Sequence, residues 1–302
     1  MISAPSRRPL RSCAIWGSAL CALALGGLLI QPLEQQTRSH ELEIGLQLPP
    51  APADSKDTLN RQLTFFAMGG LRTLAAEILA MDATGAWLVP DWPRARKRWE
   101  QITTLCPNRP SYWSRAARDM AKNAVAHVYG QKDISEHERA TLVREYLDAA
   151  EHFYLQGLAA NPHSILLQLD LAAFYEDLAR RPQFAKAVEA YRKAVSMGAS
   201  DMYQRWVFYN LCRIRGRERE AWEMGRQLFR SPRHHTPSVR CLLFALQHKL
   251  AIPREEAYSI EDLFHSDARA RKQLRSYLHN TLRFPIYGVE EYLQSSAAGN
   301  TR

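Results

Sequence analysis

Residues 95–113 read ARKRWEQITTLCPNRPSYW and contain two of the seven tryptophans in this chain of 302 residues. The small Ala95, the aromatic Trp99 one turn later and the apolar Ile102 share one face of a helix. Pro107 then interrupts the pattern, because proline inside a helix lacks an N–H group and clashes with the preceding turn. The stretch therefore predicts a helix that packs closely along this face and ends near the proline.

The spacing of these four positions, with offsets of 4, 3 and 5, recurs three times further along the chain. The later copies are Ala150, Tyr154, Gly157 and Pro162; Ala187, Tyr191, Ala194 and Ala199; and Ala221, Gly225, Leu228 and Arg233. From Ala95 onward the first alanines are 55, 37 and 34 residues apart, and 55 equals 34 plus an insertion of 21. Self-similarity at a period of about 20–50 residues is typical of repeat architectures.

On these positions the chain resembles the tetratricopeptide (TPR) family, whose repeat of about 34 residues pairs two antiparallel helices. The family pattern places Trp at the fourth position of a repeat, and counting from residue 110 puts Trp113 there. The resemblance covers roughly residues 60 to 250. It departs from the family where Ala116-Ala117 stands for Leu-Gly, Met120 for Tyr and Gln168 for Trp. The opening helix from Phe65 also looks like that of membrane-anchored bacterial TPR-like proteins.

Local signals elsewhere are helical too. Ser135 and Glu138 form an S-x-x-E capping box ahead of a long helix that we expect to end near Asn161-Pro162. No alternating strand pattern exceeds a few residues. We therefore expect an all-α protein, a TPR-like α-solenoid of antiparallel helix pairs over residues 58–293, preceded by one transmembrane helix. Residues 294–302 are expected to form a flexible tail.

The N-terminus carries a segment long enough to cross a membrane. Residues 12–30 contain no charge, and such a helix spans roughly 28 Å, close to the thickness of a bilayer core. Three arginines in residues 1–11 predict a cytoplasmic N-terminus by the positive-inside rule. The expected location is the inner (cytoplasmic) membrane, single-pass, with a proline-rich linker at 31–57 and the rest outside the cytoplasm. Because Ala22 and Ala24 form an A-x-A site, a cleaved signal peptide is the alternative.

The cysteine spacing and the charge distribution indicate no disulfide framework, zinc site or nucleic-acid partner. The five cysteines show neither a disulfide framework nor zinc-ligand spacing. We expect buried free thiols at Cys106, Cys212 and Cys241, with a Cys212–Cys241 bridge left open. Of the net charge of +9, three charges lie in the first eleven residues, and the remaining excess is dispersed. This distribution does not favour nucleic acid as a partner.

No catalytic motif stands out. His234-His235 follows Pro232 in a predicted exposed turn, with no acid or cysteine at ligand spacing. Adjacent acids such as Glu176-Asp177 point to different faces of a helix and cannot flank one bond. We expect no enzymatic activity, no bound metal and no cofactor.

The TPR resemblance implies a concave groove lined by the first helix of each pair. Its groove positions correspond to Arg118 and Lys122, counted from residue 110, and to Tyr203, Trp206, Asn210 and Arg213, counted from residue 202. Aromatic, amide and cationic groups together suit an extended peptide and its carboxylate. For each residue alone, ordinary packing between helices is the competing interpretation.

The expected function is that of a membrane-anchored TPR-like scaffold for protein–protein interactions in an exported, periplasmic-side complex. Its partners would be proteins of a membrane or envelope complex. One alternative is an exported ligand-binding protein that holds a glycan or peptide in an aromatic groove. A second alternative, an RNA-binding helical repeat, requires a cytoplasmic body.

Overall fold

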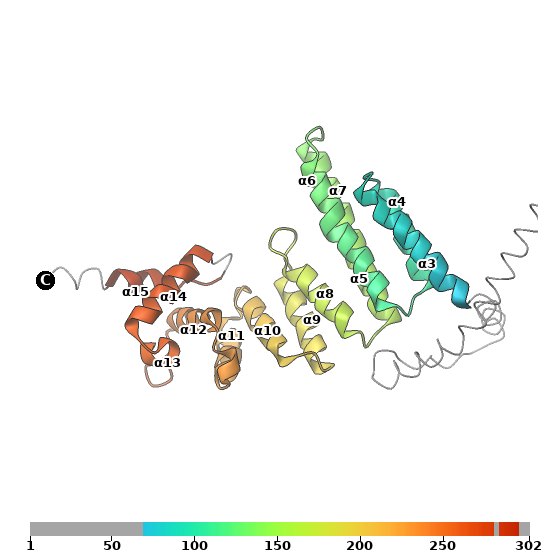
Figure 1. The fold of residues 1–302 in the computed structure, drawn as a ribbon. Coiled ribbons are helices and arrows are strands. Elements are labelled where there is room, and N and C mark those ends of the chain that lie inside the picture. The colour runs from blue at the N-terminus through green and yellow to red at the C-terminus, as the bar shows by residue number, and fades with distance from the viewer. Residues whose placement is uncertain (1–68, 281–283, 296–302) are drawn as a thin grey trace, which may run out of the picture. The chain divides into compact units, whose positions relative to one another are not determined.

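The computed structural model describes residues 69–280 and 284–295. Over these two ranges every regular element is a helix, which confirms the prediction of an all-α protein (Figure 1). None of the helices in these ranges is both long and apolar enough to cross a membrane. The predicted span at 12–30 lies outside the described residues, as do the predicted tail 1–11 and linker 31–57.

The chain forms two compact units that divide between Leu167 and Gln168. The first unit contains α3 (Gly69–Thr84), η1 (Gly85–Trp87), α4 (Trp92–Leu105), α5 (Pro110–Arg118), η2 (Asp119–Ala124), α6 (Val125–Gly130) and α7 (Glu136–Ala160). Helix α8 (Ile165–Glu176) begins in the first unit and continues into the second. The second unit continues with α9 (Phe184–Ser196), η3 (Asp201–Tyr203), α10 (Gln204–Leu211), α11 (Glu218–Phe229), η4 (Pro232–His234), α12 (Pro237–Lys249), α13 (Ile260–Phe264), α14 (Asp267–Asn280) and α15 (Val289–Ser295).

The boundaries of α7 follow from local sequence. The side chain of Ser135 accepts a hydrogen bond from the backbone N–H of Glu138 at 3.2 Å, which satisfies one of the open donors at the helix start. The helix ends at Ala160, directly before Asn161 and Pro162, because a following proline disfavours helical geometry. The predicted start and end of this helix are therefore confirmed.

The two closely spaced tryptophans have different surroundings in the first unit. Trp99 is fully buried, and its indole N–H donates to the carboxylate of Asp119 at 2.9 Å. Trp113 is half-buried, and its indole N–H donates to the carbonyl of Pro107 at 2.8 Å. Its ring also lies 6.4 Å from that of Phe153 in α7. Trp99 thus belongs to the core, while Trp113 links the turn at Pro107 to α5, the helix that follows.

The first three positions of all four sequence copies are buried. They are Ala95, Trp99 and Ile102; Ala150, Tyr154 and Gly157; Ala187, Tyr191 and Ala194; and Ala221, Gly225 and Leu228. A Cβ atom added at Gly157 would lie 2.7 Å from the Cβ of Trp113, so α7 approaches α5 very closely there. Small residues at these positions therefore allow neighbouring helices to pack against each other.

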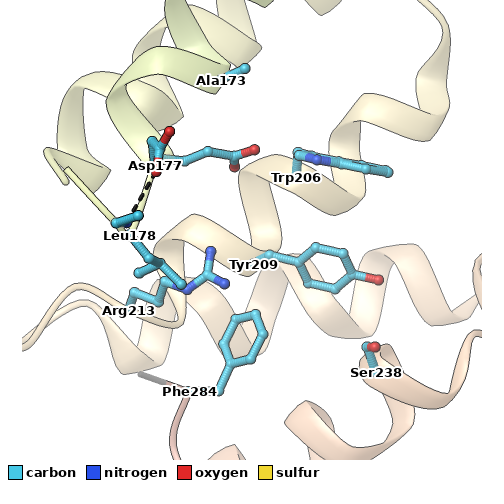
Figure 2. Close-up of a pocket in the computed structure, with 10 residues that line it drawn as sticks. Ala173, Asp177, Leu178, Trp206, Tyr209, Arg213, Ser238 and Phe284 are labelled. Atoms are coloured by element: carbon cyan, nitrogen blue, oxygen red, sulfur yellow. Dashed lines mark hydrogen bonds between the residues drawn. The ribbon is translucent and has the colours of Figure 1, made fainter. Parts of the chain in front are cut away.

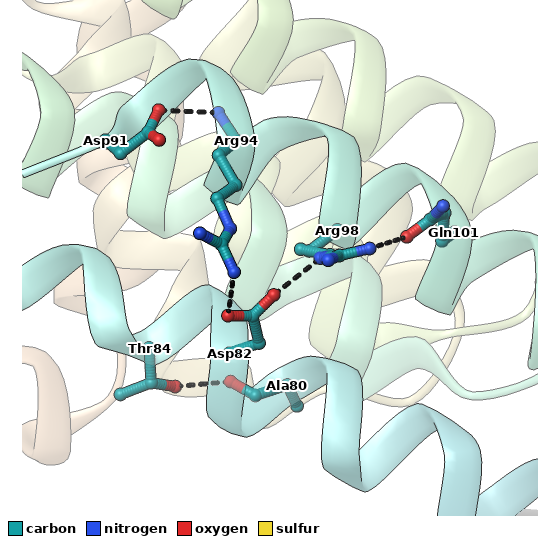
Figure 3. Close-up of polar contacts among 7 residues, drawn as sticks. All are labelled: Ala80, Asp82, Thr84, Asp91, Arg94, Arg98 and Gln101. Atoms are coloured by element: carbon teal, nitrogen blue, oxygen red, sulfur yellow. Dashed lines mark hydrogen bonds and ion pairs between the residues drawn. The ribbon is translucent and has the colours of Figure 1, made fainter.

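Polar contacts join the first two helices of the same unit (Figure 3). Asp82 in α3 accepts from Arg94 at 2.7 Å and from Arg98 at 2.6 Å, both on α4. These two arginines lower the pKa of the Asp82 carboxyl through their hydrogen bonds. Arg98 also donates to Gln101 at 2.9 Å within α4, while the two bonds to Asp82 link α4 to α3.

Two further sequence predictions concern cysteine and histidine. Cys212 and Cys241 are buried free thiols, so no disulfide joins them. Cys106 is also a free thiol, but it is only half-buried.

The predicted turn around His234 is present as η4. The predicted exposure is wrong for His234, which is only 5% exposed. The ring packs inward, and its Nε2 lies 3.9 Å from a carboxylate oxygen of Asp201.

Candidate functional site

An open cavity of about 540 Å³ lies in the second unit (Figure 2). Its walls come from the end of α8 and the loop after it, from α10 and the turn after it, from the start of α12 and from the segment before α15. The lining residues are Ala173, Glu176, Asp177, Leu178, Ala179, Trp206, Tyr209, Arg213, Ser238 and Phe284. Its volume lies within the range of about 300–1,000 Å³ that is usual for small-molecule sites.

An aromatic row borders the cavity, which two of its three rings line, Trp206 and Tyr209. Tyr203, Trp206 and Tyr209 are spaced three residues apart, so they share one face of the helix that runs through η3 and α10. The centroid of the Trp206 ring lies 5.9 Å from that of each tyrosine. Tyr209 makes an edge contact with Phe284 at 6.0 Å, and its hydroxyl lies 3.2 Å from that of Thr236. These contacts hold the rings in place, and all three remain half-buried.

Arg213 supplies the positive charge of the cavity. Its guanidinium lies 4.0 Å from the ring centroid of Phe284 and 5.4 Å from that of Phe184. Nowhere in the described ranges does this guanidinium form a hydrogen bond or an ion pair, and its Nε is buried without a partner. Burial lowers the pKa of Arg213, and the nearby Glu176 opposes that shift. The group keeps its charge at neutral pH, because an arginine starts from a pKa far above neutrality.

Glu176 supplies a negative charge to the same cavity. One of its carboxylate oxygens accepts from the hydroxyl of Tyr191 at 2.9 Å, and the other accepts from the side-chain amide of Asn210 at 2.7 Å. Burial, together with this carboxylate, raises the pKa of Tyr191 far above its ordinary value, so the phenol remains a donor. Both donors are neutral, and no ion pair within the described residues joins Glu176 to Arg213. The cavity thus contains two opposite charges that do not contact each other.

The structure brings together some of the sequence-predicted groove residues. Trp206 and Arg213 line the cavity, and Tyr203 is adjacent through its contact with Trp206. Asn210 is 0% exposed and lies behind the wall, where its amide also donates to the backbone carbonyl of Trp206 at 2.9 Å. Its side-chain oxygen is buried and has no partner among the described residues.

The other two predicted groove residues belong to the first unit. Arg118 at the end of α5 and Lys122 in η2 are both exposed. They do not line the cavity of the second unit. For these two residues the structure shows solvated cations on a helix surface.

Sequence reasoning missed several residues of the cavity. Tyr209 could have been found, because it continues the spacing of Tyr203 and Trp206 on one helix face. Phe284 carries no such signal, since it contacts Arg213 although 71 residues separate the two along the chain. The adjacent acids Glu176 and Asp177 do not lie on opposite faces of one helix, because α8 ends at Glu176 and both residues line the cavity. Their partners differ, since Asp177 pairs with Arg180 while Glu176 accepts from Tyr191 and Asn210.

The cavity offers aromatic faces, one cation and carboxylates, which are groups suited to holding a ligand or a side chain of a partner. Among the described residues, no cluster of three or more histidine, cysteine or acidic side chains is arranged to hold a metal ion. No protein-family model matches the chain, and a search of curated proteins finds no similar sequence.

Proposed function

We propose that the protein is a membrane-anchored scaffold in which TPR-like helix pairs present a binding surface to a protein partner. The repeat spacing and the burial of its first three positions in all four copies support the TPR-like arrangement. The uncharged segment 12–30 behind three arginines supports an anchor with the helical part outside the cytoplasm. The partner would then be a protein of a membrane or envelope complex.

The observation that carries this proposal is the row of half-buried rings at Tyr203, Trp206 and Tyr209 beside an open cavity. Large aromatic side chains at the centre of an interface commonly supply most of its binding energy. They also lose little conformational entropy on binding, because neighbouring rings already hold them.

Cross-linking in intact cells followed by co-purification from membranes tests the scaffold. Trp206→Ala should reduce the amount of co-purified partner at least tenfold, since a central aromatic contact is often worth about 2 kcal/mol or more. Tyr129→Ala is the matched control, because Tyr129 is an aromatic residue that is 57% exposed in the first unit. Equal recovery from wild type and both variants would reject the aromatic row as the partner-binding surface.

The size and lining of the cavity also favour a second function, that of an exported ligand-binding protein. A volume of about 540 Å³ holds a small molecule, and aromatic walls with a few polar groups are the usual composition of such sites. In that case Trp206→Ala would abolish binding of the small molecule without changing which proteins co-purify from membranes.

A further inference from the structure

The cavity in the second unit contains two charges for which the described part of the chain provides no opposite charge in contact. Arg213 is held between Phe284 and Phe184 and makes neither a hydrogen bond nor an ion pair within the described residues. Within the described residues, Glu176 accepts hydrogen bonds only from the neutral groups of Tyr191 and Asn210. A half-buried charge with no ion-pair partner in contact is costly, so a ligand that brings a group of opposite charge into contact with each residue would be stabilised by the site.

The guanidinium of Arg213 is positioned to bind an anion. It contacts the rings of Phe284 and Phe184, which limits its rotation, and its N–H groups donate to no other group of the described residues. A carboxylate matches this group, because two parallel N–H···O bonds can form between guanidinium and carboxylate. Figure 2 shows Arg213 on the same side of the cavity as Asp177 and Leu178, with Tyr209 and Phe284 next to it.

The carboxylate of Glu176 is positioned to bind a cation. Hydrogen bonds from Tyr191 and Asn210 fix its orientation, and each carboxylate oxygen retains a lone pair that can accept from a further donor. Asp177, which also lines the cavity, is already paired with Arg180. The acidic character of this wall disfavours a ligand with several negative charges, such as a nucleic acid.

Apart from Ser238, the rest of the cavity lining is apolar or aromatic. Trp206, Tyr209 and Phe284 present ring surfaces within the same cavity as the two charges. A ligand that bridges the charges would therefore place any uncharged part against these rings, where an aromatic or large apolar group buries the most surface.

We propose that this cavity binds the zwitterion of a free α-amino acid with a large apolar or aromatic side chain. The carboxylate of the ligand binds Arg213, its ammonium group binds Glu176, and its side chain packs on Trp206 and Tyr209. This assignment rests on the second function above, that of a ligand-binding protein, and is independent of whether the aromatic row also contacts a protein partner.

Equilibrium dialysis of the full-length protein in detergent with labelled L-phenylalanine tests the assignment. Unlabelled L-phenylalaninamide lacks the carboxylate, and N-acetyl-L-phenylalanine lacks the ammonium group. Each should compete at least about tenfold less well than unlabelled L-phenylalanine, because each loses one charge-assisted contact. If either analogue competes as well as L-phenylalanine, or if no binding is detected up to millimolar concentrations, the assignment is wrong.

Protein variants assign the two contacts to residues. Arg213→Gln should abolish the preference for L-phenylalanine over its amide, while Glu176→Gln should abolish the preference over the N-acetyl compound. Arg215→Gln is the matched control, since Arg215 is an exposed arginine two residues away, and it should bind as the wild type does. The ligand series on the wild-type protein needs no variant, so the test remains decisive even where a variant fails to fold.

The outcome is separable from that for the scaffold. If phenylalanine does not bind but Trp206→Ala still loses its co-purified partner, the amino-acid site is excluded and the scaffold stands. If phenylalanine binds with the expected preferences and Trp206→Ala retains its partner, the ligand site stands and the aromatic row is excluded as the scaffold's contact surface.

Discussion

Asp119 is a buried carboxylate, 6% exposed, in the core of the first unit. Its two oxygens accept from the indole N–H of Trp99 at 2.9 Å and from the amide of Asn123 at 2.8 Å. Burial raises the pKa of Asp119, while these two hydrogen bonds oppose that shift. The residue therefore satisfies the buried indole N–H of Trp99 and also the side-chain amide of the half-buried Asn123.

Removing this acceptor should destabilise the protein. Asp119→Ala leaves the indole N–H of Trp99 buried and unsatisfied, which we expect to lower the free energy of unfolding by about 1–3 kcal/mol. Chemical denaturation followed by circular dichroism measures the change. Asp133→Ala, at an exposed loop position, should change it by less than about 0.5 kcal/mol. Equal effects of the two variants would contradict a structural role for the Trp99–Asp119 hydrogen bond.

His234 predicts a dependence of stability on pH. Burial lowers the pKa of His234 below its ordinary value of about 6.5, and Asp201 only partly opposes the shift. Because the unfolded chain then takes up a proton at a higher pH than the folded chain, the stabilisation is present above about pH 6.5 and is lost as the pH falls through the folded pKa.

Melting temperatures measured between pH 8 and pH 5 test this effect. His234→Gln should show a shallower loss of stability on acidification than the wild type, because one titrating group has been removed. His137→Gln, at the exposed start of α7, should retain the wild-type slope. Parallel profiles for wild type and His234→Gln would show that this histidine does not contribute.

At the scale of elements, small residues determine where helices approach each other. Ala187 in α9 is 0% exposed, whereas Glu189 on the same helix is exposed. At Gly225 in α11, an added Cβ would lie 2.7 Å from the ring of Phe208 and 2.8 Å from Leu243. The second unit therefore depends on small side chains at the contacts between neighbouring helices.

A large residue at such a contact should overpack it. Ala187→Leu is expected to lower the free energy of unfolding by about 1–3 kcal/mol, because the added methyl groups have no space. Glu189→Leu adds a side chain of the same type on the solvent side of the same helix and should cost less than about 0.5 kcal/mol. Equal melting temperatures for these two variants would remove close packing at the alanine as an explanation for the repeat spacing.

At the scale of the whole molecule, the sequence predicts how the chain is placed across a membrane. Residues 12–30 are uncharged and follow three arginines. A reporter enzyme fused after Asp57 should therefore be active only if it is of a kind that works outside the cytoplasm. A cytoplasm-only reporter that is active at this position would contradict the orientation. The mass of the mature protein separates anchor from signal peptide, since cleavage after Ala24 removes the first 24 residues.

The sequence by itself determined the helical class, the bounds of elements such as α7 and the burial of the recurring alanine and aromatic positions. These properties follow from interactions within a few residues: helical periodicity, side-chain capping at Ser135 and the break imposed by proline. Local spacing was also enough to place Tyr203 and Trp206 on one helix face.

Only the tertiary structure decided which residues form the cavity. Phe184 precedes Arg213 in the chain and Phe284 follows it, and the rings of both lie close to its guanidinium. The side chain of Asn210 points inward and donates to the carboxylate of Glu176 instead of facing a ligand. The same holds for His234, which a turn of polar sequence suggested to be exposed and which packing buries beside Asp201. Such contacts join residues that are distant in sequence, and no local preference encodes them, because they form only when several helices pack together.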